Sequence, residues 1–381
     1  MKEINNSHLV IVRTGGSIIN IKSYNCQELG LAKALTEKAL TVSIVLAGTE
    51  NKTETIQTNS GTVNIYYRKY RSINQALSWF YNIEDLLNDL NPTKIQIHEL
   101  GMLMSWRVVK WAKKHHIPCF LIQGNYQTTL KPCFKQLEQL FNQTFGKYVL
   151  QNVEGIGCKT QMASEYVHQY CNRNTYLTNI GLDIDKFVSS KIIEKDWRKE
   201  LKLLNKKVLL YVGVLEQRRN PLFLLNVLST LPDDYVLLMV GDGPLLSIVK
   251  ETMSAKGLED KCILLGRLPQ EYLPSIYKSS DLFLLASDYE IYGMVILEAM
   301  YFGLPVISTL TAGSETLIES YENGIIINNK DEKEWGQTII SVMNDKSLQY
   351  TMKEKSEKKV KDGLIWDKAC ERFIQLYYSV K

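Results

Sequence analysis

Short apolar segments alternate with longer amphipathic segments along most of the chain. The segments expected to form strands are residues 8–12, 42–46, 94–98, 118–122, 175–179, 208–212, 236–240, 262–265, 282–285, 304–307 and 324–327. The segments with a helical pattern include residues 27–37, 73–90, 103–114, 160–170 and 366–378. Alternation of this kind is typical of parallel sheets whose strands are joined by helices. The pattern therefore predicts an α/β fold.

The alternation is interrupted between residues 180 and 207, a stretch without a clear strand that is rich in charged residues. We therefore expect two domains, each with a doubly wound parallel sheet, in residues 1–185 and 186–360. Residues 361–381 are expected to form a C-terminal helix that packs back toward the first domain. Ligands of open α/β sheets bind beyond the carboxyl ends of the strands, so a site is expected where the two sheets face a shared cleft.

Composition narrows the class of protein. Hydrophobic residues make up 45% and charged residues 23% of the chain, which is ordinary for a globular protein and excludes a disordered one. The net charge of +4 suits an anionic ligand or membrane surface and does not require nucleic acid. The start lacks the apolar core of a signal peptide, and no apolar run is long enough to span a membrane. We expect a cytoplasmic protein, with peripheral attachment to the cytoplasmic membrane face as an option.

A lone carboxylate in an apolar helix is the clearest chemical signal. Glu298 is the only charged residue between Ile291 and Ser308. The helix expected from about Tyr292 to Gly303 is apolar on all sides and should be buried. A buried carboxylate needs a partner, or it takes up a proton. Two interpretations stay open: a partner within the protein, or the hydroxyl groups of a ligand.

The start of the same helix offers groups that bind anions. Glu290 lies just before it, and the first backbone N–H groups, those of Gly293, Met294 and Val295, have no partner within the helix. Such helix N-termini bind phosphate, and Gly293 allows a ligand to approach the backbone closely.

Residues 290–308 follow the pattern E-x-Y-G-x-x-x-L-E-A-M-x-x-G-x-P-V-I-S. This pattern resembles the family 4 (group 1) glycosyltransferases, which are retaining enzymes of GT-B fold. Segments 211–215, 241–245 and 312–315 also resemble motifs of this family and occur in the same order. The resemblance covers roughly residues 8–375 and is strong after residue 176. It implies two Rossmann-like domains that face a central cleft.

The resemblance implies roles for the residues of the second domain. Glu290 is expected to contact the donor sugar, and Glu298 the ribose hydroxyls of the nucleotide. Arg219, with Arg218 beside it, is expected to hold the diphosphate, since arginine forks suit phosphate oxygens. Val214 stands where the family often has arginine. Either Arg218 supplies the missing charge, or the diphosphate is held less tightly.

Three residues of the first domain are further candidates. Gly15 and Gly16 follow the first strand, where the family has a glycine loop near the donor phosphate; an ordinary turn is the alternative. His98 ends the strand 94–98 and resembles a histidine that lines the cleft in some relatives. A buried structural histidine is equally consistent with this position. The expected catalytic set is therefore Glu290, His98 and Arg219.

The implied reaction moves a sugar from a nucleotide diphosphosugar, most commonly a UDP-sugar, to an acceptor hydroxyl with anomeric retention. The donor is a substrate, and no cofactor and no metal site is expected; Asp183-Ile184-Asp185 is interpreted as a chance match to a metal motif. The acceptor is expected to be a carbohydrate or a lipid-linked one, in surface polysaccharide or glycolipid assembly. The alternatives are a nucleotide-sugar 2-epimerase and a non-catalytic sugar-nucleotide-binding protein.

The helical segment 106–114 mixes tryptophan with basic residues, which raises the question of membrane contact. A helix packed on the sheet is the favoured interpretation. A helix resting on an anionic membrane surface is the other.

Overall fold

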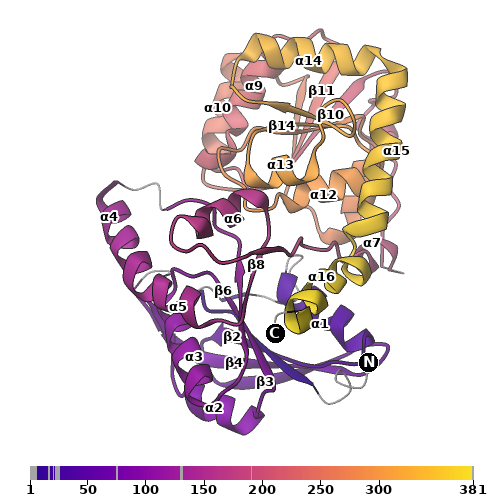
Figure 1. The fold of residues 1–381 in the computed structure, drawn as a ribbon. Helices are drawn as coiled ribbons and strands as arrows, with labels where there is room; N and C mark the ends of the chain where they lie inside the picture. The colour runs from indigo at the N-terminus through magenta and orange to yellow at the C-terminus, as the bar shows by residue number, and fades with distance from the viewer. Residues whose placement is uncertain are drawn as a thin grey trace. The chain divides into compact units, whose positions relative to one another are not determined.

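The computed structural model of the chain describes residues 7–15, 18–19, 21, 26–73, 76–128, 132–189 and 191–379, without the side chains of 132–134 and 379. It has two compact units (Figure 1). The N-terminal unit comprises residues 1–181 and 366–381, and the C-terminal unit residues 182–365. These bounds differ by a few residues from the expected ones. The C-terminal unit extends to residue 365 because Ile365 forms a bridge with Leu182, just past the end of the long helix α15 (Lys346–Gly363).

The N-terminal unit contains a nine-stranded sheet. Eight strands follow one another in the order β3-β4-β2-β1-β6-β7-β8-β9, and β5 pairs with β4. All pairings are parallel except those of β3 and β5 with β4. The strands are β1 (His8–Val12), β2 (Thr41–Gly48), β3 (Lys52–Gln57), β4 (Thr62–Ser72), β5 (Ser78–Phe80), β6 (Lys94–His98), β7 (Cys119–Gln123), β8 (Gly155–Cys158) and β9 (Tyr176–Leu177).

The antiparallel edge of this sheet corrects one prediction. The helix expected over 73–90 is wrong in its first part, where the chain forms β5 before α2 (Ile83–Leu90) begins. Ser78 and Phe80 are buried and Trp79 between them is not, which is the period of a strand. Strands β3 and β4 were not expected, because their residues are largely polar and partly exposed, as suits the edge of a sheet.

Helices cover both faces of the sheet, and one comes from the end of the chain (Figure 1). Helix α16 (Trp366–Ser379) packs beside α1 (Gln27–Glu37), β8 and β9. The Trp366 ring lies so close to Gly30 that a Cβ there would be 2.0 Å from its Nε1 atom. The other helices are α3 (Leu103–Lys114), α4 (Pro132–Phe141), the π-helical turn η1 (Asn142–Gly146), α5 (Lys147–Asn152) and α6 (Gln161–His168).

The C-terminal unit has a six-stranded sheet in the order β12-β11-β10-β13-β14-β15, parallel throughout. Its strands are β10 (Lys207–Val212), β11 (Tyr235–Val240), β12 (Cys262–Gly266), β13 (Leu282–Leu285), β14 (Val306–Thr309) and β15 (Ile325–Ile327), close to the predicted ones. Its helices are α7 (Asp185–Val188), α8 (Trp197–Glu200), α9 (Pro221–Ser229), α10 (Leu246–Ala255), α11 (Leu273–Lys278), α12 (Met294–Tyr301), α13 (Ala312–Leu317), α14 (Glu332–Asn344) and α15. The predicted α/β fold is confirmed.

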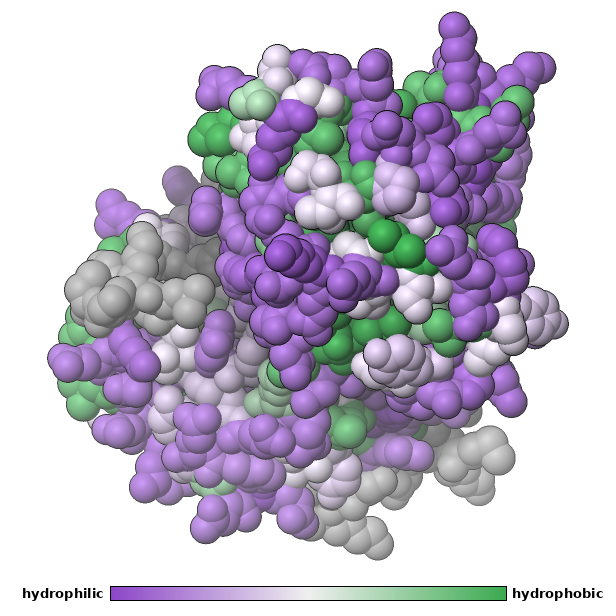
Figure 2. Space-filling model, turned by 90° about the horizontal axis from the view of Figure 1, so that it is seen from above, coloured by the Kyte–Doolittle hydropathy of each residue, from purple (hydrophilic) through white to green (hydrophobic). Residues whose placement is uncertain are grey.

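Apolar side chains fill the strands, and polar ones cover the outside. All residues of β11 and the last five of β10 are buried. The face shown in Figure 2 is mostly hydrophilic, with hydrophobic residues confined to smaller areas between the polar ones. In each sheet the order of the parallel strands reverses once, between β1 and β6 in the N-terminal unit and between β10 and β13 in the C-terminal unit. In doubly wound sheets, ligands bind at such reversal points, beyond the carboxyl ends of the strands.

Candidate functional site

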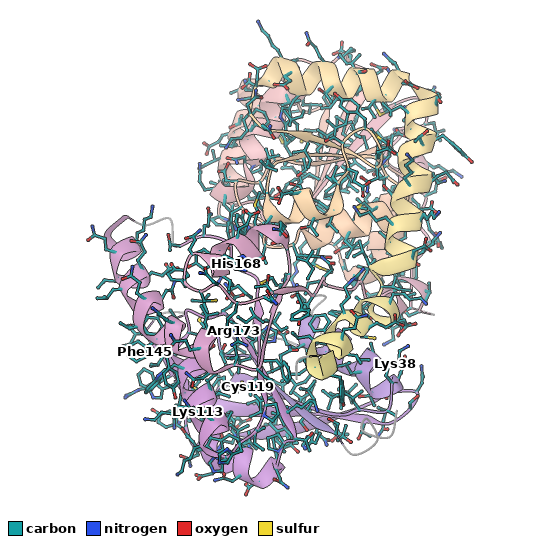
Figure 3. All side chains as sticks on the ribbon, viewed as in Figure 1. Lys38, Lys113, Cys119, Phe145, His168 and Arg173 are labelled. Atoms are coloured by element: carbon teal, nitrogen blue, oxygen red, sulfur yellow. The ribbon has the colours of Figure 1, made fainter. Side chains whose placement is uncertain are left out.

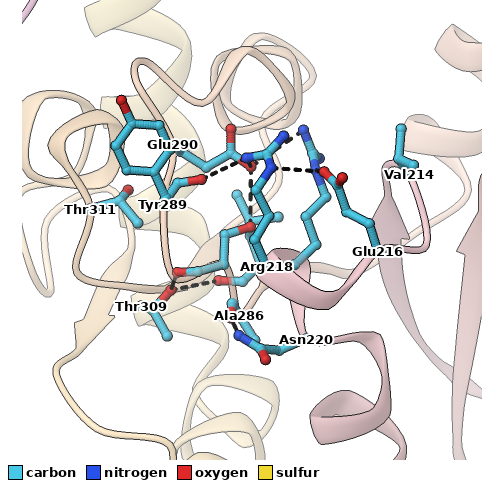
Figure 4. Close-up of polar contacts among 12 residues, drawn as sticks. Val214, Glu216, Arg218, Asn220, Ala286, Tyr289, Glu290, Thr309 and Thr311 are labelled. Carbon is cyan, nitrogen blue, oxygen red and sulfur yellow. Dashed lines mark hydrogen bonds and ion pairs between the residues drawn. The ribbon is translucent and has the colours of Figure 1, made fainter. Parts of the chain in front are cut away.

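Two loops meet at the reversal point of the C-terminal unit. One follows β10 and carries Arg218 and Arg219, and the other follows β13 and carries Glu290. Backbone and side-chain hydrogen bonds join the loops: the Asp288 N–H donates to the Arg218 carbonyl at 2.8 Å, and Asn220 Nδ2 donates to the Ala286 carbonyl at 2.9 Å (Figure 4). The fold therefore brings together the two arginines and the glutamate that the sequence had singled out.

Glu290 is held by several donors at once. Its Oε1 atom accepts a hydrogen bond from Ser287 Oγ at 3.1 Å. It also lies 3.4 Å from Arg218 NH1 and 3.3 Å from Arg219 NH2. Arg218 NH1 donates in addition to the Tyr289 carbonyl at 2.7 Å (Figure 4). The carboxylate is thus fixed between two cations, in position to accept hydrogen bonds from a ligand.

Arg219 has donors that the described protein does not satisfy. Its side chain is 14% exposed, and its Nε and NH1 atoms are buried without a hydrogen-bond partner among the described residues. Arg219 Nε also forms an ion pair with Glu216 Oε1, but the distance of 3.6 Å is too long for a hydrogen bond. A buried donor without an acceptor costs about 1–3 kcal/mol. An anionic ligand at this point would supply the missing acceptors.

The guanidinium lies over the glycine turn at the end of β10. A Cβ on Gly213 would be 2.4 Å from Arg219 NH1, so a larger residue there would displace the guanidinium. Gly241, at the end of β11, has a φ of +145° and approaches the Gly213 carbonyl so closely that a Cβ would lie 1.8 Å from its oxygen. Val214 next to this turn is 47% exposed.

Helix α12 begins at Met294, two residues later than predicted. Gly293 is its N-cap, with a φ of +70° that favours glycine. No described residue accepts from the N–H groups of Gly293, Met294 and Val295. The helix ends at Tyr301, two residues before the expected Gly303, and Phe302 is its C-cap. Gly303 has a φ of +71°, and its N–H and that of Leu304 donate to carbonyls of the last turn. An unsatisfied helix N-terminus therefore follows directly on the loop of Glu290.

Glu298 has a partner within the protein. Its side chain is completely buried, and Tyr277, also completely buried, donates its hydroxyl to Glu298 Oε2 at 2.9 Å. Burial and the neighbouring carboxylate raise the pKa of Tyr277 well above its usual value. Of the two interpretations of this carboxylate, the structure shows the local hydrogen bond. Contact between Glu298 and a ribose stays a prediction. It would require a ligand to reach a side chain that is completely buried in this structure.

His98 lies at the reversal point of the N-terminal unit, at the end of β6. Gln96 Nε2 is 2.9 Å from His98 Nε2, and the buried Tyr377 of α16 donates its hydroxyl to Gln96 Oε1. Because an amide nitrogen only donates, His98 Nε2 accepts and the ring proton of the neutral histidine sits on Nδ1. Burial lowers the pKa of His98 to about 3, so it is uncharged at neutral pH.

Charged groups surround this histidine. Glu28 on α1 is buried and accepts from Arg13 NH1 at 2.7 Å, and its Oε1 is 3.9 Å from His98 Nδ1. Burial, the largest single influence, would raise the pKa of Glu28, but the nearby charges, first that of Arg13, together with a backbone hydrogen bond outweigh it and lower the pKa to about 2. Lys159, after β8, is buried, and donates to Gln27 Oε1 at 3.0 Å. Burial lowers the pKa of Lys159.

Glu99 shapes the loop after β7. It has a φ of +63°, which is uncommon for a residue with a side chain. Its carboxylate accepts from Gln123 Nε2 at 2.8 Å and from the N–H groups of Gly124 and Asn125, both at 3.1 Å. Burial raises its pKa. Sequence reasoning missed Arg13, Glu28, Gln96, Glu99 and Tyr377, because only the fold places them beside His98 and its loop.

The remaining predicted positions are less informative. A Cβ on Gly15 would meet no atom within 4 Å, and Gly16 lies outside the described residues. Within the described part of the chain, no group of three or more His, Cys, Asp or Glu is arranged to hold a metal ion. The helices described include none with the length and apolarity needed to cross a membrane.

Comparisons with known proteins point the same way as the motifs. Residues 193–359 match the family described as glycosyl transferases group 1. The D-inositol 3-phosphate glycosyltransferase of Corynebacterium urealyticum is 26% identical over 212 residues, 52% of this chain and 50% of that protein. The UDP-Gal:alpha-D-GlcNAc-diphosphoundecaprenol alpha-1,3-galactosyltransferase of Escherichia coli is 30% identical over 210 residues, 52% of this chain and 53% of that protein. The chain thus spans about half the length of these curated relatives.

The fold resembles solved structures over nearly its whole length. The crystal structure of Anabaena Alr3699/HepE in complex with UDP has a TM-score of 0.76 and is 16% identical, covering 98% of this chain and 100% of that one. At this identity the similarity establishes the fold, which is GT-B.

Proposed function

We propose that this chain, a GT-B protein whose residues 193–359 match the group 1 glycosyltransferases, transfers a sugar from a nucleotide diphosphosugar to an acceptor hydroxyl. The observation that carries this proposal is the buried guanidinium of Arg219. It has two unsatisfied donor atoms and lies at the strand-order reversal of the C-terminal unit, where a ligand is expected. A diphosphate would satisfy these donors.

The donor is proposed to be a UDP-sugar. One similar structure contains UDP, and one relative is named for UDP-Gal. The diphosphate would be held by Arg218, Arg219 and the N–H groups at the start of α12. These groups stand ready to stabilise the charge that develops on the leaving diphosphate. Glu290, fixed by both arginines, would accept hydrogen bonds from hydroxyls of the donor sugar.

The reaction is proposed to proceed with retention. No Asp or Glu is assigned as a nucleophile, so the acceptor hydroxyl would attack from the face that the diphosphate leaves, and its proton would pass to a diphosphate oxygen. His98, kept neutral by burial, is proposed to orient the acceptor hydroxyl. The acceptor would be a carbohydrate or a lipid-linked saccharide, in surface polysaccharide or glycolipid assembly.

Turnover with a panel of UDP-, GDP- and ADP-sugars tests this proposal. With the preferred donor, we expect release of nucleoside diphosphate together with a glycosylated acceptor. Glu290→Gln should lower kcat/KM about 100-fold, because the fixed carboxylate is lost from the site. The matched control is Glu84→Gln. Glu84 lies in the N-terminal unit and is also paired with an arginine, Arg107.

Each other outcome identifies a different function. Epimerised donor formed without acceptor would indicate a nucleotide-sugar 2-epimerase. Nucleotide binding without any turnover would indicate a non-catalytic binding protein. Nuclear magnetic resonance of the product gives its anomeric configuration, and an inverted product would overturn retention.

A further inference from the structure

One side of the N-terminal unit exposes large apolar side chains on α4 and the π-helical turn after it. Leu137 is 62% exposed, Leu140 58% and Phe145 36%. Leu137, Leu140 and Phe141 are spaced three and four residues apart and share one helix face. The wider π-helical turn adds Phe145 to the same face, since its ring stacks on that of Phe141 with 4.8 Å between centroids.

Helix α3 packs against this face through Trp106. Trp106 packs edge-on against Phe145, with ring centroids 5.2 Å apart. We call Trp106, Leu137, Leu140, Phe141 and Phe145 the apolar strip. Because its aromatic members contact one another, the strip is a continuous surface on two helices and not a set of scattered residues.

Apart from Trp106, which is partly buried against the core, the strip is not needed to fill the core. The same helical segment has a separate inner face, on which Asn142, Gly146, Val149 and Leu150 are buried. Gly146 packs so closely on Leu100 that a Cβ there would be 2.8 Å from its Cδ1 atom. Apolar side chains this exposed on the opposite side call for an external partner.

The charge around the strip indicates what that partner is. Residues 103–152 contain seven Lys and Arg but a single acidic residue, Glu138, although the whole chain carries a net charge of only +4. Phe145 and Lys113 lie along the same side of this unit (Figure 3). Lys110 Nζ lies 5.3 Å from the centre of the Trp106 ring. The exposed lysines of this region are Lys110, Lys113, Lys114, Lys135 and Lys147.

We propose that the apolar strip docks on an anionic phospholipid bilayer. Leu137, Leu140 and Phe145 would enter the boundary between headgroups and acyl chains, and the surrounding lysines would bind the phosphates. A second copy of this chain is the less suitable partner, because a symmetric dimer through this face would bring like charges together. The proposal goes beyond the proposed function and does not depend on it, since it concerns the place of action and not the reaction.

The structure also corrects the basis on which membrane contact was expected. Helix α3 has Met104, Val108, Val109 and Trp111 buried against the sheet, as the favoured interpretation of 106–114 required. Its lysines flank the strip, but the exposed apolar groups come from α4 and η1, which the sequence analysis did not single out.

Cosedimentation of the full chain with vesicles tests the proposal. Wild-type protein should bind vesicles of phosphatidylcholine mixed with phosphatidylglycerol, and bind phosphatidylcholine alone much less. Added salt should weaken the binding. The double variant Leu137→Gln/Leu140→Gln and the double variant Lys135→Glu/Lys147→Glu should each lower the partition coefficient about tenfold or more.

The controls change equally exposed residues of the C-terminal unit. Leu204→Gln/Ile248→Gln and Lys250→Glu/Lys333→Glu should bind as the wild type does. Circular dichroism must first show that every variant is folded. Equal binding to neutral and anionic vesicles, or unchanged binding of both strip variants, would overturn the proposal. A wild-type dimer that Leu137→Gln/Leu140→Gln dissociates in the absence of lipid would also overturn it, in favour of a second copy as the partner.

Discussion

At the scale of single residues, contacts within the fold determine the surroundings of each candidate group. The arginines of the C-terminal unit hold Glu290 between two positive charges. In the N-terminal unit, burial keeps His98 neutral, and Gln96 fixes which of its nitrogens carries the proton. A neutral histidine with a defined tautomer has one ring N–H to offer a hydroxyl oxygen. These states follow from contacts between distant parts of the chain.

The neutrality of His98 makes a prediction for stability in mild acid. Its pKa is about 3 in the folded protein and 6.5 when unperturbed. Below pH 6.5 the unfolded chain therefore binds a proton that the folded chain does not, and the free energy of unfolding falls as the pH falls toward 3. This histidine alone contributes a slope approaching about 1.4 kcal/mol per pH unit.

Urea unfolding measured from about pH 7 down to about pH 5 tests this prediction. His98→Gln should flatten the dependence on pH. The pKa of His8 is also lowered by burial, so part of the slope should persist. Glu28, whose unperturbed pKa is 4.5, contributes only at lower pH. The control His168→Gln changes an exposed histidine and should keep the wild-type slope. An unchanged slope in His98→Gln would show that the ring is charged in the folded protein.

At the scale of elements, the start of α12 depends on the conformation of one glycine. Gly293 has a φ of +70°, and an added Cβ would be 3.1 Å from Ile296 Cδ1. Gly257, at the end of α10, has a similar φ of +61° but open space around it. Alanine at either position should lower the free energy of unfolding by roughly 1–2 kcal/mol, because a left-handed backbone disfavours a side chain.

The two glycines should differ in their effect on ligand binding. Gly293→Ala should weaken nucleoside diphosphate binding about tenfold, because it redirects N–H groups that are expected to contact the phosphate. Gly257→Ala should leave binding unchanged. Titration calorimetry of both variants measures the difference. Equal affinities of the two variants for the nucleoside diphosphate would show that the start of α12 does not bind the phosphate.

The elements also show what the sequence could and could not reveal. Buried parallel strands such as β10 and β13 were predicted nearly residue for residue, since they are continuous apolar runs. Strands β3 and β4, at one side of the sheet, were missed because their largely polar residues lack this signal, and β5 was missed because it has only three residues. The candidate residues Arg218, Arg219 and Glu290 were chosen from sequence motifs, and their roles stay predictions. Tyr377 reaches Gln96 from 281 residues away in sequence, and no local pattern predicts such a contact.

At the scale of the whole molecule, each unit carries candidate residues at the reversal of its own strand order. The C-terminal unit presents the cluster of Arg218, Arg219 and Glu290, and the N-terminal unit presents His98 among charged groups. We propose that the nucleotide diphosphate binds at the first of these and the acceptor at the second. The central claim of this proposal is that the buried donors of Arg219 bind the diphosphate.

Titration calorimetry with UDP and UMP tests this claim most directly. Wild-type protein should bind UDP at least about tenfold more tightly than UMP, because a charge-assisted hydrogen bond contributes about 1.5–3 kcal/mol. Arg219→Gln should reduce this preference, and the control Arg107→Gln, which breaks the pair with Glu84, should keep it. Equal affinity of the wild type for UDP and UMP, or an undiminished preference in a folded Arg219→Gln variant, would contradict the account.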